Sequence, residues 1–218
     1  MVVVCKKAGL AYFSIPKCAC SSLKIFFHEV ETGKTWRETK KEYIARNEPK
    51  TIHEEYPPEP ATQDLWDRVE GYDKICVVRG PVSRLLSCYN NKVVEEKVLS
   101  RPVVRSRLVA AGLPHQPDFE TFVDNLDGYQ EISKSIARHS QPLEHWLGSD
   151  ADRFTKIFSM KGLSEFGDWM KQRVADVPEL RHSNRSKGGT KPAQIDPAVR
   201  QRIKSRYASD IEVYGPWL

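Results

Sequence analysis

Two segments of the sequence each combine a short apolar run, a turn and the start of an amphipathic helix, and they constrain the fold most. In the first, residues 10–15 precede Pro16 and Lys17, and apolar residues recur at helical spacing from Ser21. In the second, residues 74–78 precede Arg79 and a helix expected over 82–96. Because N–H groups and the dipole at a helix start favour anions, both turns are predicted to bind phosphate or sulfate.

The remaining patterns predict an α/β fold with a P-loop-like parallel sheet flanked by helices. Residues 154–159 form a third expected strand, followed by a helix over 163–174. Buried strands that alternate with helices are typical of parallel sheets covered on both faces. We expect residues 31–60 to form a polar surface loop and residues 119–147 to be helical. A last helix is expected after Asp196 as N-cap and Pro197 at the first position.

Size and composition suit one globular domain over residues 1–218. The net charge of +5 favours anionic ligands over a nucleic-acid coat. The absence of a membrane-length apolar run and of a signal-peptide pattern predicts a cytoplasmic protein. The five cysteines are odd in number and lie near the two turns, so reduced thiols are expected, with no metal site.

The residues of the two turns narrow the kind of anion. The full nucleotide-binding pattern G-x-x-x-x-G-K-[ST] is absent, since no glycine lies between Gly9 and Gly33. The strand over 74–78 ends in Arg79, where magnesium-dependent hydrolases place an aspartate. A guanidinium binds phosphate and repels a cation. The pair of turns therefore suggests a ligand with phosphates at both ends and no metal requirement.

Both turns resemble motifs of one enzyme family. Residues 15–24, Ile-Pro-Lys-Cys-Ala-Cys-Ser-Ser-Leu-Lys, resemble the 5′-phosphosulfate loop of sulfotransferases, particularly the carbohydrate (chondroitin-type, family 2) branch, P-K-x-G-C-T-x-x-K. Residues 78–89, Val-Arg-Gly-Pro-Val-Ser-Arg-Leu-Leu-Ser-Cys-Tyr, resemble the 3′-phosphate motif V-R-D-P-x-x-R-x-x-S-x-Y. A fainter resemblance covers residues 180–186 and the closing Tyr207, Asp210 and Tyr214. Ala19 replaces a frequent glycine, and Gly80 replaces a frequent aspartate.

The resemblance implies a sulfotransferase whose donor is 3′-phosphoadenosine 5′-phosphosulfate (PAPS). Lys17 would be the catalytic cation at the leaving oxygen. The 5′-phosphosulfate would lie on residues of the first turn: Lys17, Cys18, Ala19, Cys20, Ser21 and Ser22. Arg79 and Ser87 would bind the 3′-phosphate. Arg185, Ser186 and Lys187 would meet phosphate from a lid over 182–191, for which a plain surface loop is the alternative.

The acceptor is predicted to be a hydroxyl, which must lose its proton to a general base. The resemblance makes His53 the first choice, because it follows a short apolar pair between the two motifs, where the related enzymes place a catalytic histidine or glutamate. Glu54 or Glu55 are the alternatives. His53 as a plain polar loop residue is the competing interpretation. Residues 138–146 either line the acceptor cleft or belong to the core. The carbohydrate-type loop favours a sugar hydroxyl, with lipid, peptide and small-metabolite acceptors still open.

Two other functions compete with sulfuryl transfer. A divergent magnesium-dependent P-loop kinase or hydrolase would need an acidic metal ligand after a strand, and neither turn supplies one. A non-catalytic basic module would bind polyanions through residues 181–191, which contain four Arg or Lys residues and no acid. Such a module would not need Lys17.

Overall fold

The computed structural model describes residues 2–180 and 190–218 of the chain. The contacts divide these residues into two compact units. The first comprises residues 2–78, 143–180 and 213–218, and the second comprises residues 79–142 and 190–212. Each unit combines segments that are distant in sequence. The expectation of one domain over residues 1–218 stays a prediction.

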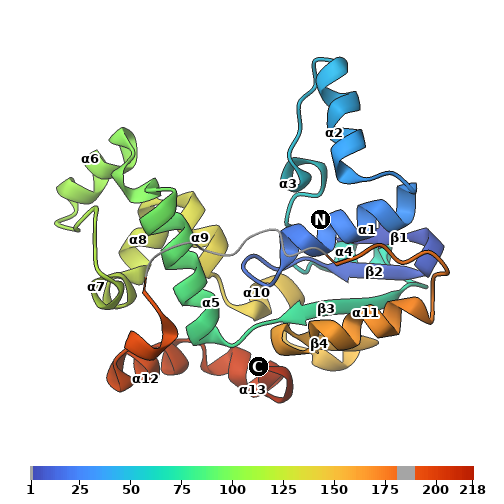
Figure 1. Cartoon of the computed structure of the whole chain (residues 1–218). Coiled ribbons are helices and arrows are strands. Elements are labelled where there is room, and N and C mark those ends of the chain that lie inside the picture. The colour runs from blue at the N-terminus through green and yellow to red at the C-terminus, as the bar shows by residue number, and fades with distance from the viewer. Residues whose placement is uncertain (1, 181–189) are drawn as a thin grey trace. The chain divides into compact units, whose positions relative to one another are not determined.

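A four-stranded sheet forms the centre of the first unit (Figure 1). Its strands are β1 (Val3–Cys5), β2 (Leu10–Phe13), β3 (Asp73–Val78) and β4 (Lys156–Ser159), in that spatial order. The pairs β2–β3 and β3–β4 are parallel, which confirms the predicted α/β fold. The sequence patterns did not predict β1, which pairs antiparallel with β2.

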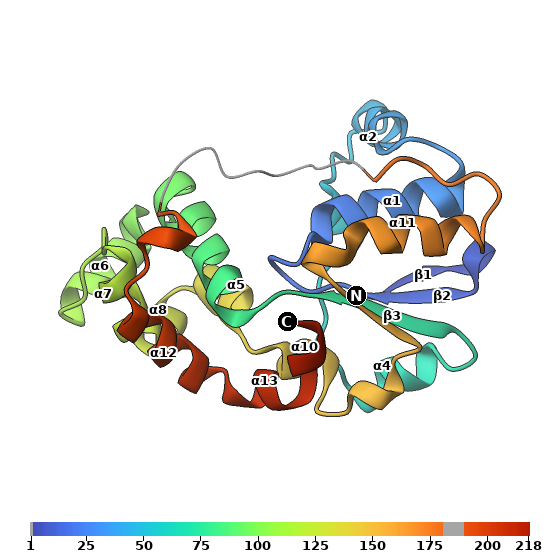
Figure 2. The same cartoon turned by 60° about the horizontal axis from the view of Figure 1, so that its bottom comes forward.

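Helices cover one face of this sheet, as Figure 2 shows for α1 (Cys20–Thr32) and α11 (Leu163–Lys171). Alternate strand residues point to this face because side chains of a strand alternate between its two sides. The resulting core is built from aromatic and aliphatic side chains, among them Tyr12, Ile75, Val77, Phe158, Phe26, Phe27 and Phe166. The helices α1 and α11 therefore pack their apolar sides on this face of the sheet.

The opposite face is covered by α4 (Gln63–Arg68) and by α10 (Leu143–Leu147). Phe13 stacks on Trp66 of α4 with ring centroids 4.6 Å apart. Cys76 and Val78 of β3 belong to the same apolar cluster. The prediction of helices on both faces is therefore confirmed.

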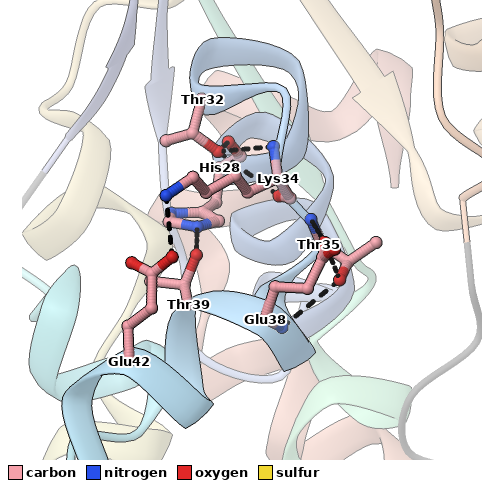
Figure 3. Close-up of polar contacts among 7 residues, drawn as sticks. All are labelled: His28, Thr32, Lys34, Thr35, Glu38, Thr39 and Glu42. Atoms are coloured by element: carbon pink, nitrogen blue, oxygen red, sulfur yellow. Dashed lines mark hydrogen bonds and ion pairs between the residues drawn. The ribbon is translucent and has the colours of Figure 1, made fainter. Parts of the chain in front are cut away.

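The expectation of a loop over residues 31–60 was wrong, because this segment contains α2 (Trp36–Ala45) and α3 (Ile52–Glu55). Both helices begin with a capping box, made by Thr35 with Glu38 and by Thr51 with Glu54. Contacts of α2 with α1 and with Lys34 in the loop between the two helices support α2, as Figure 3 shows. In it, Nε2 of His28 lies 2.8 Å from the hydroxyl of Thr39, and Lys34 pairs with Glu42 at 2.7 Å.

The described part of the second unit is helical. The helix predicted over 82–96 is α5 (Pro81–Cys88), which continues as a π-helical segment over Tyr89–Glu95. The predicted last helix is present as α12 (Pro197–Arg206), where Asp196 accepts a hydrogen bond from Ala198 N at 2.7 Å. The other helices that follow α5 are α6 (Pro102–Ala110), α7 (Phe119–Asp124), α8 (Leu126–Ile132) and α9 (Lys134–Ser140).

The helical region predicted over 119–147 is a series of short helices, α7 to α10, instead of one long helix. Ser133 interrupts it by capping α9. The helix α13 (Ala208–Tyr214) follows α12. Short 3₁₀ turns occur at Lys6–Ala8, Val98–Ser100, Ala151–Arg153, Met160–Gly162, Pro192–Gln194 and Gly215–Trp217. Within residues 2–180 and 190–218, every helix is too short or too polar to cross a membrane.

Candidate active site

The loop between β2 and α1 turns sharply at two residues. Lys17 and Ala19 have φ angles of 68° and 55°, in the left-handed region that glycine adopts most readily. Between them, the buried Cys18 anchors the loop, and its N–H donates to Ile15 O at 3.3 Å. Ala19 thus takes the left-handed conformation in spite of its methyl group, at the position where the resembling motif has glycine.

The start of α1 presents the groups expected of an anion site. Ala19 is the N-cap residue and makes no side-chain cap hydrogen bond. Ser21 and Ser22 stand in the first turn, which contains no acidic residue. The first turn of a helix carries partial positive charge and N–H groups that the helix itself does not satisfy. Lys17, half-buried in the preceding loop, adds a full positive charge to the same segment.

His53 lies against this helix start, although 32 residues separate it from Ser21. Its Nε2 is 2.8 Å from Ser21 Oγ, and its Nδ1 is 3.3 Å from Lys24 Nζ. The Lys24 side chain is almost fully buried, with 1% of the residue exposed. Lys24 matches the final lysine of the resembling motif but was not predicted as a site residue, although its position one helical turn after Ser21 places the two residues on one face.

The two glutamates beside His53 make contacts of their own. Glu54 Oε2 accepts a hydrogen bond from Thr51 N at 2.6 Å. This bond, together with a second hydrogen bond between the Thr51 hydroxyl and the Glu54 carboxylate, lowers the pKa of Glu54. Glu55 pairs with Lys50 at 3.4 Å. The lowered pKa makes Glu54 a weaker proton acceptor than an ordinary carboxylate.

In the second turn, which belongs to the second unit, the side chain of Arg79 is hydrogen-bonded to Ser83. Gly80 is the N-cap of α5 and Pro81 its first residue. Arg79 Nε donates to Ser83 Oγ at 3.1 Å, and Ser83 in turn donates to Gly80 O at 3.0 Å. Ser87, one helical turn after Ser83, is half-buried. These bonds hold the Arg79 guanidinium at the start of α5.

Arg84, next to Ser83, belongs to the interior of the second unit. Only 2% of it is exposed. Its Nη2 donates to Gln141 O, and its guanidinium lies 5.8 Å from the ring centroid of Tyr207. The buried cation of Arg84 thus stabilises the path of the chain at Gln141.

Residues 138–146 divide between the two interpretations considered for them. Trp146 is buried in the apolar cluster against the sheet, so this part belongs to the core. His145 packs edge-on against Trp146, and burial lowers the pKa of its imidazole. His139 lies 2.7 Å from Ser135 O through its Nδ1. An acceptor-binding role for this stretch stays a prediction.

Arg185, Ser186 and Lys187 lie outside the described residues. All five cysteines are free thiols. In the described parts of the chain, no three His, Cys, Asp or Glu side chains are arranged to hold a metal ion. The predicted independence from metal stays a prediction.

Comparison with known proteins identifies one family. A family model described as "Sulfotransferase family" matches residues 1–215, nearly the whole chain and parts of both units. The carbohydrate-type resemblance of the first turn fits this family. No curated protein matches the chain.

Proposed function

Because the chain belongs to the sulfotransferase family, we propose that it transfers a sulfuryl group from PAPS to a hydroxyl acceptor. The observation that carries the proposal is the start of α1, where Lys17, Ser21 and Ser22 accompany a first turn without acidic residues. Such a segment suits the phosphosulfate of the donor, which offers only oxygen acceptors and negative charge. The donor is a substrate, and both of its ends need cationic partners.

The reaction requires charge stabilisation more than covalent catalysis. The acceptor oxygen forms a new bond to sulfur while the bond between sulfur and the 5′-phosphate oxygen breaks. The products are a sulfate ester and 3′-phosphoadenosine 5′-phosphate, whose 5′-phosphate gains the negative charge. In the proposal Lys17 meets this charge, and Ser21 and Ser22 with the N–H groups from Cys18 onward hold the remaining oxygens. Positioning the reactants supplies most of the remaining acceleration.

The 3′-phosphate would bind Arg79 and Ser87. The bond from Arg79 Nε to Ser83 supports this assignment, because it restrains the guanidinium at the start of α5, and a guanidinium binds phosphate through charge-assisted hydrogen bonds. An arginine also distinguishes a phosphate from a magnesium ion. This part of the proposal explains why the donor would be PAPS and not a simple nucleoside phosphosulfate.

The acceptor hydroxyl must also release its proton. Of the three residues that sequence reasoning selected, Glu54 is disfavoured by its lowered pKa. His53 and Glu55 remain, and the assignment of His53 as the base stays a prediction. For the acceptor class we propose a sugar hydroxyl, on the resemblance of residues 15–24 to the carbohydrate-type loop.

Calorimetric titration separates this function from its two competitors. The purified protein would be titrated with 3′-phosphoadenosine 5′-phosphate, with ATP and magnesium, and with an oligonucleotide. Saturable binding of the first alone supports the proposal, whereas no binding of it overturns the proposal. Lys17→Ala should abolish sulfuryl transfer, while Lys40→Ala, which removes an exposed charge from α2, should not. Transfer should persist in the presence of a chelator.

A further inference from the structure

The contacts of His53 determine which of its nitrogens carries the proton. An ammonium group donates hydrogen bonds and accepts none. Lys24 Nζ, 3.3 Å from His53 Nδ1, is therefore the donor, and Nδ1 accepts through its lone pair. A proton on Nδ1 would set two donors facing each other. The neutral imidazole thus carries its proton on Nε2, at the atom next to Ser21.

This proton assignment determines the direction of the Ser21 hydroxyl. His53 Nε2–H donates to Ser21 Oγ, 2.8 Å away. A hydroxyl that accepts from the imidazole directs its own hydrogen to a different acceptor. Ser21 lies in the first turn of α1, the segment proposed to bind the phosphosulfate. An anionic oxygen bound there would receive a hydrogen bond from Ser21 that His53 has oriented.

The burial of Lys24 restrains the inner end of the arrangement, whereas His53 is exposed. With 1% of the residue exposed, its long side chain has few alternative rotamers. His53 is presented from α3, whose capping box with Thr51 fixes the short helix. The three side chains therefore form a connected chain of hydrogen bonds that begins at a buried cation and ends at the helix start.

We propose that Lys24 is a positioning residue that holds His53 as its Nε2–H tautomer, and that His53 in this form orients Ser21 toward the donor phosphosulfate. The inference rests on the proposed function. It gives His53 a role in donor binding, because a nitrogen that already carries a proton does not take one from the acceptor. It therefore competes directly with the assignment of His53 as the general base.

Binding of 3′-phosphoadenosine 5′-phosphate to single and double variants tests the proposal. Ser21→Ala, His53→Ala and Lys24→Met should each weaken binding, by about tenfold for the loss of one charge-assisted hydrogen bond. Because His53 acts through Ser21, the double variant that combines Ser21→Ala with His53→Ala should bind the nucleotide no more weakly than Ser21→Ala alone. Unchanged affinity of His53→Ala, or additive losses in the double variant, would overturn the proposal.

His53→Gln provides the conservative control. Its amide N–H can donate to Ser21 while its carbonyl accepts from Lys24, but an amide is not a base. The positioning role predicts that His53→Gln recovers both nucleotide affinity and turnover relative to His53→Ala. A general base predicts that both variants lose turnover equally and bind the nucleotide as the wild type does, and that outcome would also overturn the proposal.

A spectroscopic measurement on the protein without donor tests the tautomer itself. Long-range ¹H–¹⁵N correlations of the labelled wild-type protein should show His53 protonated at Nε2 and bare at Nδ1. Lys24→Met should add a population protonated at Nδ1, whereas Lys24→Arg should not. A wild-type His53 protonated at Nδ1 contradicts the inference without affecting the proposed function. Failure of the wild type to bind the nucleotide contradicts the proposed function instead.

Discussion

The imidazole of His28 joins two helices of the first unit, since its Nε2 lies 2.8 Å from Thr39 Oγ1 (Figure 3). Its Nδ1 lies 2.9 Å from the hydroxyl of Tyr56, and Trp36 packs edge-on against the ring. One buried histidine of α1 therefore contacts α2 and the residue that follows α3. Because α3 carries His53, the stability of this cluster bears on the candidate site.

The first prediction concerns pH. Burial lowers the pKa of His28, and Glu55 and Glu29 partly oppose this effect. The unfolded chain therefore takes up the proton more readily than the folded protein does. The contribution to stability is fully present above the unfolded value of about 6.5 and is lost as pH falls toward the lower folded value. Urea unfolding should show this as a free energy of unfolding that falls as the pH drops below about 6.5.

Replacement of His28 tests how much of the pH dependence of the free energy of unfolding comes from this residue. His28→Gln should unfold with a smaller dependence on pH than the wild type, even where it is less stable overall. His145, whose pKa is also lowered by burial, will retain its own contribution. His115→Gln serves as the matched control because His115 is only half-buried. Identical slopes for His28→Gln and the wild type would refute this explanation.

The second prediction concerns recognition of the donor's remote phosphate. Arg79→Gln should weaken binding of 3′-phosphoadenosine 5′-phosphate by tenfold or more, the usual size for a hydrogen bond to a charged group. Binding of adenosine 5′-phosphate, which lacks the 3′-phosphate, should not change. Competition titration measures both affinities. Arg105→Gln, an exposed change on α6, is the control, and an equal loss for both ligands would contradict the assignment.

The third prediction concerns the left-handed residue in the first turn. Ala19 has a φ of 55°, where a methyl group is strained and glycine is not. Ala19→Gly should raise the free energy of unfolding by roughly 0.5–1 kcal/mol, because relief of strain exceeds the added freedom of the unfolded chain. The helical Ala45→Gly should have the opposite effect. Denaturant unfolding measures both changes in the free energy of unfolding. Destabilisation by Ala19→Gly would show that the backbone at Ala19 is not strained.

The fourth prediction separates Arg84 from the nucleotide site. Arg84→Met removes the donor to the Gln141 carbonyl in the interior of the second unit. We expect a loss of about 2 kcal/mol of stability, the cost of an unsatisfied buried acceptor. Affinity of the folded protein for 3′-phosphoadenosine 5′-phosphate should stay within twofold, roughly the error of such titrations. A large loss of affinity with normal stability would instead place Arg84 in the binding site.

The strands and helices that pack against the sheet were the predictable part of the fold. Residues 10–15, 74–78 and 154–159 are rich in β-branched, aromatic or other apolar residues because both faces of a parallel sheet are buried, and this composition is visible without the structure. The short β1 was not predictable in this way, since three residues show no period. Its pairing with β2 depends on the turn at Gly9, whose φ is 65°.

The segment with α2 shows where pattern reasoning fails. Only Thr39 of α2 is buried, so the helix lacks the apolar stripe from which helices are recognised. Its stability comes from the capping box at Thr35 and from the contact of Thr39 with His28. The cap is visible in the sequence, but the contact joins residues that become neighbours only in the folded chain.

The candidate site was predictable in its parts and not in its connections. The positions of Lys17, Ser21 and Arg79 beside helix starts follow from strand, turn and helix patterns. The hydrogen bond between Lys24 and His53 cannot be predicted from such patterns, because α2 lies between the two residues in the sequence and a helical lysine usually faces solvent. Long-range polar contacts of buried side chains depend on tertiary packing, which local periodicity does not encode.

The short β1 has a consequence for the behaviour of the protein at high concentration. The outer strands of an open sheet expose unpaired N–H and C=O groups that can recruit a strand from another molecule. Here the outer strands have only three and four residues, and Lys156 of β4 pairs with Glu165 of α11 at 2.8 Å. A strand from another molecule could therefore form only a few backbone hydrogen bonds with these strands, and at β4 it would meet charged side chains. The sheet is thereby protected against intermolecular β-aggregation.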